Sequence, residues 1–398
     1  MEVDTAVILA GGEGERLRPL TRNRPKPLLP AGNRPIIEYV LDSVIEAGIS
    51  DIHVVVGYKH NRVQSHLGDT YSDVDLTYHI QEKQLGSGHA LLQARDAVTD
   101  PFLVVNGDQI TEPSIITDVL SAHDAAMAAS MGVIESDKAA EYGTVSLTDG
   151  HVTDLTEHPE TDAGGLLNAG VYVFTPEIFS VLADLPRPGG VLPIPAGVSA
   201  LVADPETAVL GVETDGFWTD ATYPWDLLTV AEQVFSMDWI DLPSQETDVW
   251  VADSATIHPA AELVPPVVVG VDSEIAAGAV IGPHVALGRN TTVDSNSVLT
   301  RTVLDTDCRV GANTTLIDTV FGQNVTVGSS SVVTGGRNDI QLNDRVYPDR
   351  ELGCVIADRT TVGGGVTIGG GLLLGSDATI EDGVSLSRNV ADGAEVRE

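Results

Sequence analysis

The residues best suited to chemistry lie between Gly11 and Pro27, a stretch rich in glycine and arginine. It begins Gly-Gly-Glu-Gly-Glu-Arg-Leu-Arg-Pro-Leu-Thr and ends Arg-Pro-Lys-Pro. Glycines that directly follow a buried strand let backbone N–H groups close on phosphate oxygens. The alternative is a dinucleotide-binding turn of the dehydrogenase type, but the residues after Gly12 do not give the spacing G-x-G-x-x-G. We therefore interpret the stretch as a site for phosphate groups.

Two cations in this stretch, Arg16 and Lys26, are candidates for direct contact with phosphate. Lysine is rare in the chain, where it occurs only at Lys26, Lys59, Lys83 and Lys138. One of these few lysines lies between Pro25 and Pro27, whose fixed backbone angles hold it in a defined, extended pose. A cation held in this way fits a site where phosphorylated molecules bind.

The composition excludes several classes of partner. The 398 residues suffice for two or three domains, and 42% of them are hydrophobic, so real cores can form. The formal net charge of −37 argues against nucleic acid and against an anionic membrane surface, because both attract clustered Lys and Arg. Abundant carboxylates with few lysines resemble the surface of a salt-adapted, haloarchaeal-like protein. In molar salt the Debye length falls to ~3 Å, which screens the self-repulsion of such a surface.

The cysteines and the N-terminus add two further expectations. Cys308 and Cys354 give neither a disulfide framework nor a metal-ligand spacing. The N-terminus runs directly into an apolar strand at residues 6–10 without a signal peptide, and no apolar run is long enough to span a bilayer. We therefore expect a cytoplasmic protein.

The first 110 residues alternate between strand and helix patterns, which must position the phosphate site. Strands are predicted at residues 6–10, 52–56, 74–80 and 102–105, and helices at residues 35–48 and 87–98. Such alternation is typical of a parallel sheet with helices on both faces, in which ligands bind beyond the carboxyl ends of the strands. Gly11 and Asp108 both directly follow such strand ends.

Residues from about 125 to 220 are less regular, with strand-like pieces at 143–147 and 170–174. We interpret this region as the substrate half of the same α/β, Rossmann-like domain, whose sheet is expected to be mixed and mostly parallel. A helix predicted at residues 224–240 closes the domain. The expected organisation is therefore a first domain over residues 1–240, a linker over 241–250 and a second domain over 251–398.

After residue 250 an aliphatic residue recurs at every sixth position. The series begins at Val251 and continues to Leu386 with two one-residue slips, and the residue that follows is often Gly or Ala. A six-residue period fits a coil with three short flat sides per turn, where each side points one aliphatic residue inward. The pattern predicts a left-handed parallel β-helix of hexapeptide repeats. Residues from about 335 to 352 interrupt the series, so we expect a loop to project there.

These motifs resemble the signature of the sugar-1-phosphate nucleotidyltransferases, the NDP-sugar pyrophosphorylases. The match rests on Gly-Gly-x-Gly-x-Arg-Leu-x-Pro-Leu-Thr followed by Pro-Lys-Pro, and it extends to the segments Gln81–Ala90, Asn106–Asp108, Asn168–Gly170 and Trp218–Asp220. The hexapeptide tail matches the two-part layout of archaeal and bacterial members, which include N-acetylglucosamine-1-phosphate uridylyltransferases and glucose-1-phosphate thymidylyltransferases. The resemblance therefore covers nearly the whole chain.

The resemblance implies a role for each matching residue. Arg16 and Lys26 would be catalytic, the first on the pyrophosphate group and the second between the sugar phosphate and the α-phosphate. Asp108 and Asp220 would bind Mg²⁺, which favours one or two carboxylates plus phosphate oxygens. The nucleotide would be bound by Leu9, Gly11, Gly12, Gly14, Gln81, Gly86 and Ser87. The sugar phosphate would be bound by Gly143, Glu157 and Asn168.

The implied reaction joins a nucleoside triphosphate, UTP or dTTP, to a sugar 1-phosphate of the glucose or N-acetylglucosamine type and releases pyrophosphate. A sugar-phosphate oxygen attacks the α-phosphorus, so no general base is required. Because two anions must meet, charge neutralisation and positioning carry most of the catalysis. One residue departs from the family pattern: Glu15 stands where Thr or Ser is usual. A carboxylate beside a triphosphate is repulsive unless it points away or meets a cation.

Two alternatives stay open at this stage. Some relatives carry an acetyltransferase on the β-helix, which uses acetyl-CoA and a catalytic His. Residues 332–339 followed by 350–356 resemble its loop and the coil after it. Here Asn338 stands at the matching His position, and an amide cannot accept a proton as imidazole can. A non-catalytic regulatory homologue is the other alternative, against which the intact Arg16, Lys26 and Asp108 speak. By resemblance we also expect a homo-oligomer, namely a trimer formed through the β-helix.

Overall fold

The structure is a computed structural model of the chain and describes residues 3–137, 139, 143–156, 164–237 and 239–397. Contacts between residues divide the chain into two compact units, which we call the first and the second unit. The first consists of Met1–Glu13, Pro25–Leu28 and Ile36–Asp220, and the second of Gly14–Arg24, Leu29–Pro35 and Ala221–Glu398. The expected linker at residues 241–250 lies within the second unit, and the domain boundary placed there stays a prediction from the change in sequence pattern.

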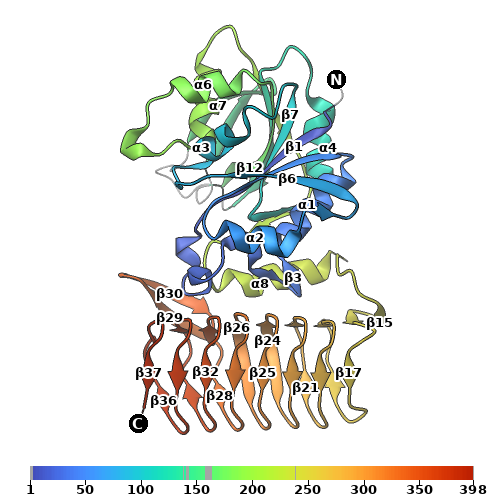
Figure 1. The fold of residues 1–398 in the computed structure, drawn as a ribbon, viewed down its shortest axis with the longest axis vertical. Coiled ribbons are helices and arrows are strands. Elements are labelled where there is room, and N and C mark those ends of the chain that lie inside the picture. Colours follow the sequence, from blue (N-terminus) through green and yellow to red (C-terminus); the bar gives the residue numbers. More distant parts are fainter. Residues whose placement is uncertain (1–2, 138, 140–142, 157–163, 238, 398) are drawn as a thin grey trace. The chain divides into compact units, whose positions relative to one another are not determined.

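The first unit is built on a mixed sheet of ten strands, counted over the described residues (Figure 1). Its strands are β1 (Thr5–Ala10), β4 (Asp51–Val56), β5 (Thr70–Tyr71), β6 (Val74–Ile80), β7 (Phe102–Asn106), β9 (Ala129–Ser136), β10 (Thr144–Thr148), β11 (His151–Thr156), β12 (Gly165–Phe174) and β13 (Val209–Glu213). Their order is β10-β11-β13-β9-β12-β7-β1-β4-β6-β5. Pairings are parallel among β7, β1, β4 and β6 and between β9 and β13, and antiparallel elsewhere. The predicted mixed sheet is confirmed. It is not mostly parallel as expected, because six of the ten strand pairings among the described residues are antiparallel.

Helices cover both faces of this sheet, as predicted. They are α1 (Ile36–Glu46), α2 (His60–Leu67), α3 (Ser87–Leu91), α4 (Pro113–Ala122), α6 (Ile178–Asp184) and α7 (Ile194–Ala203). Side chains alternate between the two faces of a strand. In β1, Val7 and Leu9 therefore join the core under α3, α6 and α7, whereas Ala6, Ile8 and Ala10 join the core under α1, α2 and α4. In Figure 1, α3, α6 and α7 lie together on one side of this unit.

The predicted strands and the first predicted helix agree with the structure to within a few residues, whereas the second helix is shorter than predicted. Instead of continuing from Ser87 to Val98, α3 ends at Leu91 and is followed by a 3₁₀ turn at Leu92–Ala94. Leu91, Ala94 and Val98 are all buried. The apolar spacing therefore predicted correctly which residues are buried, although a short α-helix followed by a 3₁₀ turn, and not one long helix, buries them. Further 3₁₀ turns lie at η3 (Lys26–Leu28) and η5 (Pro188–Gly190).

The second unit consists mainly of a parallel β-helix, which confirms the expectation from the hexapeptide pattern. Its short strands before the interruption are β15 (Ser244–Glu246), β16 (Val249–Val251), β17 (Thr256–Ile257), β18 (Glu262–Leu263), β19 (Val267–Val269), β20 (Glu274–Ile275), β21 (Val280–Ile281), β22 (Val285–Leu287), β23 (Thr292–Val293), β24 (Val298–Leu304), β25 (Arg309–Val310), β26 (Thr315–Phe321), β27 (Thr326–Val327) and β28 (Val332–Val333). Those after it are β31 (Cys354–Ile356), β32 (Thr361–Val362), β33 (Thr367–Ile368), β34 (Leu372–Leu374), β35 (Thr379–Ile380), β36 (Ser385–Leu386) and β37 (Glu395–Val396).

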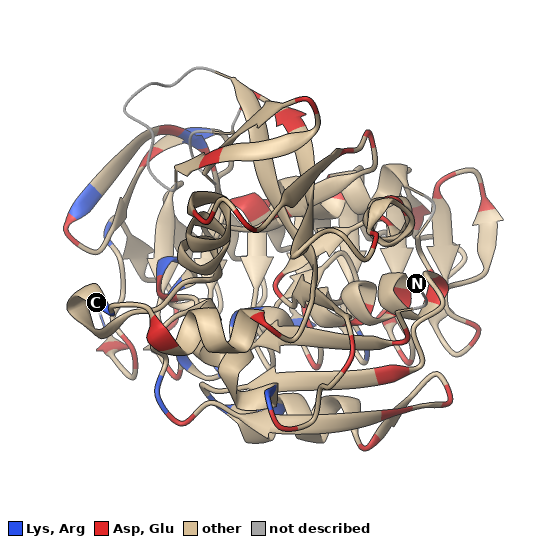
Figure 2. Cartoon of the chain, turned by 90° about the horizontal axis from the view of Figure 1, so that it is seen from above, with Lys and Arg blue, Asp and Glu red and all other residues tan. Residues whose placement is uncertain are grey.

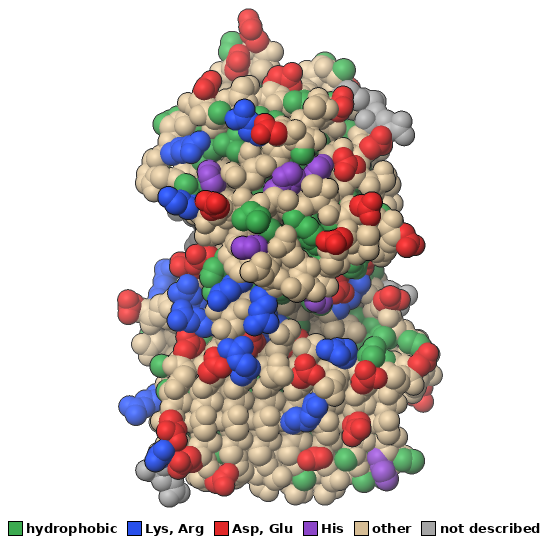
Figure 3. Space-filling model, viewed as in Figure 1, with side chains coloured by type: hydrophobic (Ala, Val, Ile, Leu, Met, Phe, Trp, Pro, Cys, Tyr) green, Lys and Arg blue, Asp and Glu red, His purple; other side chains and the backbone are tan. Residues whose placement is uncertain are grey.

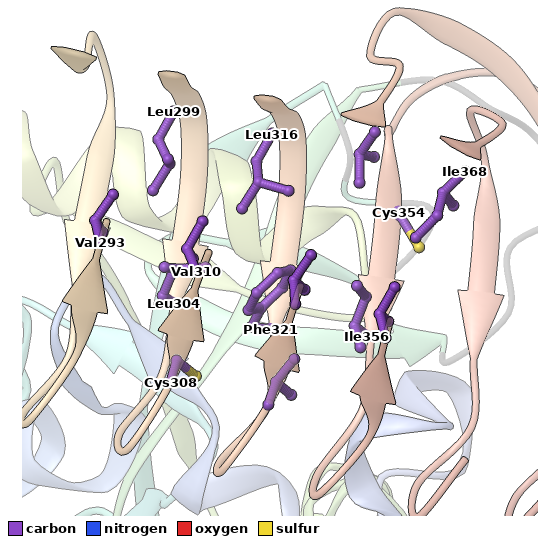
Figure 4. Packing of buried hydrophobic residues seen from close by; sticks show 14 of the residues in the cluster. Val293, Leu299, Leu304, Cys308, Val310, Leu316, Phe321, Cys354, Ile356 and Ile368 are labelled. Carbon is purple, nitrogen blue, oxygen red and sulfur yellow. The ribbon is translucent and has the colours of Figure 1, made fainter. Parts of the chain in front are cut away.

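The aliphatic residues of the repeat form the core of the coil. Val251 pairs in register with Val269, and Val269 pairs with Leu287. Each partner lies 18 residues further along the chain, so one turn of the coil consists of three hexapeptides. Their side chains and those of the other inward positions belong to one buried cluster. Figure 4 shows these residues stacked from coil to coil, for example Leu299 beside Leu316. Both cysteines are buried here as small apolar side chains and are unpaired with each other.

The interruption of the repeat is an antiparallel hairpin of β29 (Arg337–Leu342) and β30 (Arg345–Glu351). The projecting loop predicted at residues 335–352 is thus confirmed. The second unit also contains η1 (Glu15–Leu17), η2 (Leu20–Arg22), β2 (Pro30–Ala31), β3 (Arg34–Pro35) and α8 (Asp226–Ser236). Helix α8 corresponds to the predicted closing helix, and it packs on β2, β24 and β26.

Charge and polarity on the surface follow the composition. Asp and Glu are spread over the helices, strands and loops of both units, whereas Lys and Arg are sparse (Figure 2). The side of the coil that carries β17, β25 and β32 is formed mainly by uncharged polar side chains and backbone (Figure 3). Five of the eight equivalent strand positions in this row are threonines, at 256, 292, 326, 361 and 379, and the other three are Glu274, Arg309 and Glu395. Over the described residues, no helix has both the length and the hydropathy needed to cross a bilayer.

Candidate active site

Three charged side chains meet in the first unit and form the centre of the candidate site. The Lys26 ammonium lies 3.1 Å from a carboxylate oxygen of Asp108 and makes a second, closer ion pair with Asp220. The side chains of Lys26 and Asp220 are 10% and 5% exposed, whereas that of Asp108 is 38% exposed. The lysine expected to be catalytic and both expected metal ligands therefore lie together at one partly open position.

A two-stranded ribbon that the sequence pattern did not reveal brings the two aspartates together. It pairs β8 (Gln109–Thr111) with β14 (Trp218–Asp220), and Asp220 lies opposite Gln109. Asp108 precedes Gln109, in the turn that follows β7. That turn is held against the end of β1, because the Gly107 N–H donates to the Leu9 carbonyl at 2.9 Å. The carboxyl ends of two neighbouring parallel strands thus place Asp108, as expected for ligand sites in such sheets.

The electrostatics of this cluster determine what Lys26 can do. Burial alone would lower the pKa of Lys26, but the nearby carboxylates of Asp108 and Asp220 outweigh burial and raise it above its usual value. The amine is therefore a permanent cation at the pH of a cell and cannot serve as a base or a nucleophile. Its chemical use is to neutralise negative charge, first that of the two carboxylates and then that of phosphate groups brought beside them.

Two of the residues expected to bind the sugar phosphate lie close together, with Gly143 directly before β10 and Asn168 in β12. The Asn168 N–H lies 3.4 Å from the Gly143 carbonyl, in the pairing of β12 with β10. The Asn168 side chain is held internally, since it donates to the Tyr172 hydroxyl at 2.6 Å and accepts from the Gly170 N–H at 3.1 Å. The third expected residue, Glu157, lies outside the described residues.

The segment that contains Asn168 packs directly on the segment that contains Asp108. Asn106 donates to the Gln109 side chain at 3.0 Å, and both side chains approach Gly170 so closely that a Cβ there would collide with them. The Trp218 indole donates to the Ala169 carbonyl at 3.0 Å. Sequence reasoning missed these three polar side chains, Asn106, Gln109 and Trp218. The available signal was their position beside Asp108 and Asp220 in the matching motifs.

The residues expected to bind the base are also close together in the first unit. Gln81 is buried, and its amide donates to the Gly86 carbonyl at 3.1 Å. Its other partner is a ring nitrogen of His89 at 3.0 Å. The Gln81 carbonyl oxygen faces Gly11, where an added Cβ would lie 2.9 Å from it. The Ser87 hydroxyl accepts from the Ile194 N–H at 2.9 Å, which joins this segment to the start of α7.

His89, which the sequence reasoning did not use, fixes the direction of the Gln81 amide. Burial lowers the pKa of His89, with a further contribution from the charge of Arg187, so its imidazole is neutral. A neutral imidazole nitrogen without a proton accepts, and the Gln81 amide group then uses its two N–H donors on His89 and on the Gly86 carbonyl. The side-chain oxygen of Gln81 is therefore the group that faces Gly11.

The remaining residues expected to bind phosphate, Gly14 and Arg16, belong to the second unit. The Arg16 guanidinium lies over the Tyr223 ring, 5.9 Å from its centre. Glu15, the departure from the family pattern, is 71% exposed, and its carboxylate lies 3.6 Å from Arg18. Glu15 thus meets a cation, which is one of the conditions under which a carboxylate is tolerated near a triphosphate. Beside Gly12, of the first unit, there is open space where a Cβ would be.

The donor set for a metal consists of the two carboxylates around Lys26. Over the described residues, no group of three or more His, Cys, Asp or Glu side chains is arranged to hold a metal ion. Mg²⁺ does not need such a group, because it is commonly bound by one or two carboxylates plus substrate phosphates and water. Asp108 and Asp220, which face one cationic position, fit that ligand pattern.

Comparisons with known proteins agree on the kind of chain. Residues 5–236 match the sequence model described as "Nucleotidyl transferase", and residues 245–347 match "GMPPB C-terminal domain". The chain is 28% identical over 376 residues to "Bifunctional protein GlmU" of Methanococcus maripaludis, which covers 90% of this chain and 88% of that protein. It is 34% identical over 227 residues to "UTP--glucose-1-phosphate uridylyltransferase AglF" of Haloferax volcanii, and this match covers 56% of this chain and 92% of that protein.

A solved structure supports the same assignment. The crystal structure of a putative glucose-1-phosphate thymidylyltransferase from Bacillus anthracis matches with a TM-score of 0.53 and 26% identity. The match covers 61% of this chain and 98% of that protein.

Proposed function

The chain belongs to the nucleotidyl transferase family, and we propose that it joins UTP or dTTP to a sugar 1-phosphate of the glucose or N-acetylglucosamine type, releasing pyrophosphate. The coarser statement, that it is a sugar-1-phosphate nucleotidyltransferase, follows from the family and from the relatives named for this reaction. The proposed transfer chemistry is supported above all by one observation. Lys26, a permanent cation, lies between two carboxylates, Asp108 and Asp220, at the carboxyl ends of the central strands.

The proposed mechanism uses this cluster to bring two anions together. The sugar phosphate is already ionised, so it attacks the α-phosphorus without a base while pyrophosphate leaves in line. The Lys26 ammonium exchanges a carboxylate contact for contacts with the sugar phosphate and the α-phosphate. Arg16 and the backbone N–H groups near Gly11, Gly12 and Gly14 bind the pyrophosphate half of the triphosphate. Gly143, Glu157 and Asn168 complete the sugar-phosphate side.

We further propose Mg²⁺ as the metal, held by Asp108 and Asp220 together with phosphate oxygens. Bound there, Mg²⁺ would supply charge for the leaving pyrophosphate. In the structure Lys26 neutralises the two carboxylates that the metal would occupy. The lysine thus keeps two acidic side chains close together, and with a metal held there its ammonium would be available to phosphate groups.

The choice of a uracil or thymine base is supported by the orientation of Gln81. Its carbonyl oxygen is the group left to face Gly11, so it offers an acceptor. Uracil and thymine carry an N3–H donor that such an acceptor can bind, whereas cytosine presents a bare ring nitrogen at the same position. A buried acceptor that meets another acceptor loses its partner, which costs about 1–3 kcal/mol.

The proposal is tested by measuring pyrophosphate release from each of UTP, dTTP, CTP, ATP and GTP with glucose 1-phosphate, N-acetylglucosamine 1-phosphate or glucosamine 1-phosphate, in molar KCl with Mg²⁺. We expect turnover with UTP or dTTP and one of the first two sugars, and a rate with CTP at least ~10-fold lower. The same screen with acetyl-CoA added tests for acetyl transfer by release of free thiol. Absence of turnover with every pair would refute the proposed function and favour the regulatory alternative.

The metal assignment leads to a separate prediction. Asp108→Asn removes one negative charge but keeps the shape of the side chain, so we expect the Mg²⁺ concentration for half-maximal activity to rise ~10-fold or more. A titration of initial rate against Mg²⁺ measures this. The control is Asp184→Asn at the end of α6, which should leave the titration unchanged. If the Asp108→Asn curve coincides with that of the wild type, the metal binds elsewhere.

The acetyltransferase alternative receives no support from the hairpin. Asn338, at the position where that activity would need a His, donates its amide to the carbonyls of Gly336 and Leu352 at 2.9 and 3.0 Å. Its side chain therefore closes the base of the hairpin. We propose that the β-helix instead forms a homotrimer, for which its broad threonine-lined side offers a surface of low charge, and that the enzyme works in the cytoplasm.

A further inference from the structure

We propose that the β-helix positions the catalytic arginine: a buried Arg24–Asp305–Asp358 triad holds the Gly14–Arg24 segment, and with it Arg16, on one edge of the coil. This inference rests on the proposed function, since it assigns Arg16 to the leaving pyrophosphate. It goes further because it makes two carboxylates of the β-helix positioning residues for the transfer reaction. The β-helix would then contribute to catalysis within a single chain.

The triad lies inside the second unit and joins residues that are remote in sequence. One terminal nitrogen of Arg24 pairs closely with Asp305, and the other lies 3.1 Å from Asp358. The three side chains are only 2%, 10% and 4% exposed. Burial alone would lower the pKa of Arg24, but the two carboxylates outweigh burial and raise it. A planar guanidinium whose two terminal nitrogens each pair with a fixed carboxylate has a defined position and direction.

The two carboxylates occupy corners of the coil that are built to receive this arginine. Leu304, Phe321 and Ile356 pair in register on successive turns. Asp305 follows the first, Gly322 the second, and Asp358 lies two residues after the third. An added Cβ at Gly322 would collide with the Asp358 carboxylate. That carboxylate also accepts the Gln323 N–H at 2.9 Å, so its direction is fixed by the backbone.

A weaker ion pair extends the contact along the same row of corners. Arg22 lies 3.3 Å from Asp392, near the turn where the Leu374 strand is bridged by Val390. Both side chains are exposed, so this pair contributes little by itself. In a chain of net charge −37, however, two arginines of one short segment meet carboxylates on one row of corners. The charges are therefore distributed to hold the segment on this edge.

The start of the segment is held by the hairpin and by the residues before α8. The Tyr223 ring beneath Arg16 stacks on Trp225, with centres 4.8 Å apart, and Tyr347 of β30 packs against both rings. The Tyr223 N–H donates to Asp226 at 2.7 Å, and Arg301 of the coil pairs with Glu232 in α8. Burial raises the pKa of Tyr223, with a further contribution from its hydrogen bond to Tyr347.

Between these two contact points the segment is held together by its own hydrogen bonds, so a displacement at one end moves the other end. The Thr21 hydroxyl donates to the Gly14 carbonyl at 2.7 Å, and the Leu17 N–H donates to the same carbonyl at 3.0 Å. Leu17 and Leu20 are fully buried. A shift at Arg24 would therefore move the whole turn, including Arg16. Misplacement of a catalytic group by about 1 Å can cost ~100-fold in rate.

The test uses Asp305→Asn, which lies in the coil and far along the sequence from every proposed substrate contact. We expect kcat to fall ~10- to 100-fold with little change in the KM of the sugar phosphate. Because the triad acts through Arg16, the loss should shrink to less than ~2-fold when Asp305→Asn is made in an Arg16→Ala background. Arg24→Lys keeps the positive charge but loses the planar pair of terminal nitrogens, so its kcat should fall by an intermediate factor. Arg397→Gln breaks an exposed ion pair of the last coil and should change nothing.

Hydrogen exchange of the same variants gives a readout besides activity. In Asp305→Asn we expect faster exchange confined to residues 14–24, with coil peptides protected as in the wild type. An Asp305→Asn or Arg24→Lys protein with wild-type kcat would overturn the proposal, provided the wild type is active. So would loss of protection along the whole coil, because the triad would then be a stability element only. A wild type without turnover would instead refute the proposed function.

Discussion

Lys26→Ala is expected to lower kcat/KM by ~100- to 1,000-fold, the largest loss of any single substitution in the proposed site. The reason is electrostatic: Lys26 is the cation that lies between Asp108 and Asp220, and the reaction must bring two phosphate anions to that position. Without the ammonium, the two carboxylates would repel the incoming phosphates. Initial rates at saturating Mg²⁺ with the best substrate pair measure the effect.

A second measurement separates catalysis from stability. Removing Lys26 leaves the nearly buried Asp220 without its cation, so we expect the melting temperature without Mg²⁺ to fall by roughly 5 °C. Added Mg²⁺ should restore the melting temperature by neutralising the same carboxylates, but it should not restore turnover. The control is Lys59→Gln, which removes an exposed lysine beside Tyr58. Turnover of Lys26→Ala within tenfold of the wild type would mean that the lysine's role is misassigned.

The second large effect is expected from salt. With a net charge of −37, the folded chain repels itself, and molar KCl screens this repulsion over ~3 Å, compared with about 10 Å at 0.1 M. We expect the melting temperature to drop by more than about 10 °C between 2 M and 0.1 M KCl. Light scattering in the same series should report a trimer at high salt that dissociates at low salt. Thermal unfolding followed by circular dichroism measures the first effect.

Screening must be distinguished from the general effect of salts on apolar burial. Sucrose at matched water activity strengthens burial without screening charge. It should therefore recover only a minor part of the lost stability in 0.1 M KCl. The Arg24 triad is buried and thus screened far less than surface charges, so it should not be the element that fails. A melting temperature that is independent of KCl would exclude salt adaptation.

Much of the fold could be predicted because its signals are local and repeated. The aliphatic residue at every sixth position must point inward on each side of the coil. The series that begins at Val251 therefore predicts the β-helix without any long-range information. Strand β1 was equally visible as a short apolar run that ends in glycines. The larger antiparallel part of the sheet was not visible, because strand direction depends on how β9 to β13 pair across the unit.

The candidate site was predicted in its residue types and only partly in its arrangement. Asp108 was found because it directly follows a buried strand, and Lys26 because it is a rare lysine held between two prolines. The β8–β14 ribbon that brings Asp220 to Lys26, 194 residues away, has no local signature in the sequence. The direction of the Gln81 amide likewise depends on His89 in α3, whose pKa is lowered mainly by partial burial.

The sequence by itself therefore determined the kind of protein: the period of the coil, the phosphate-binding stretch and the scarce lysine within it. The tertiary structure alone decided which charges meet. Glu15 lies in solvent beside Arg18, and the buried charge of Arg24 is balanced by Asp305 and Asp358, which are 281 and 334 residues away in the sequence. Charge pairs act over a few ångströms in space and leave no periodic trace along the chain, so only folding reveals them.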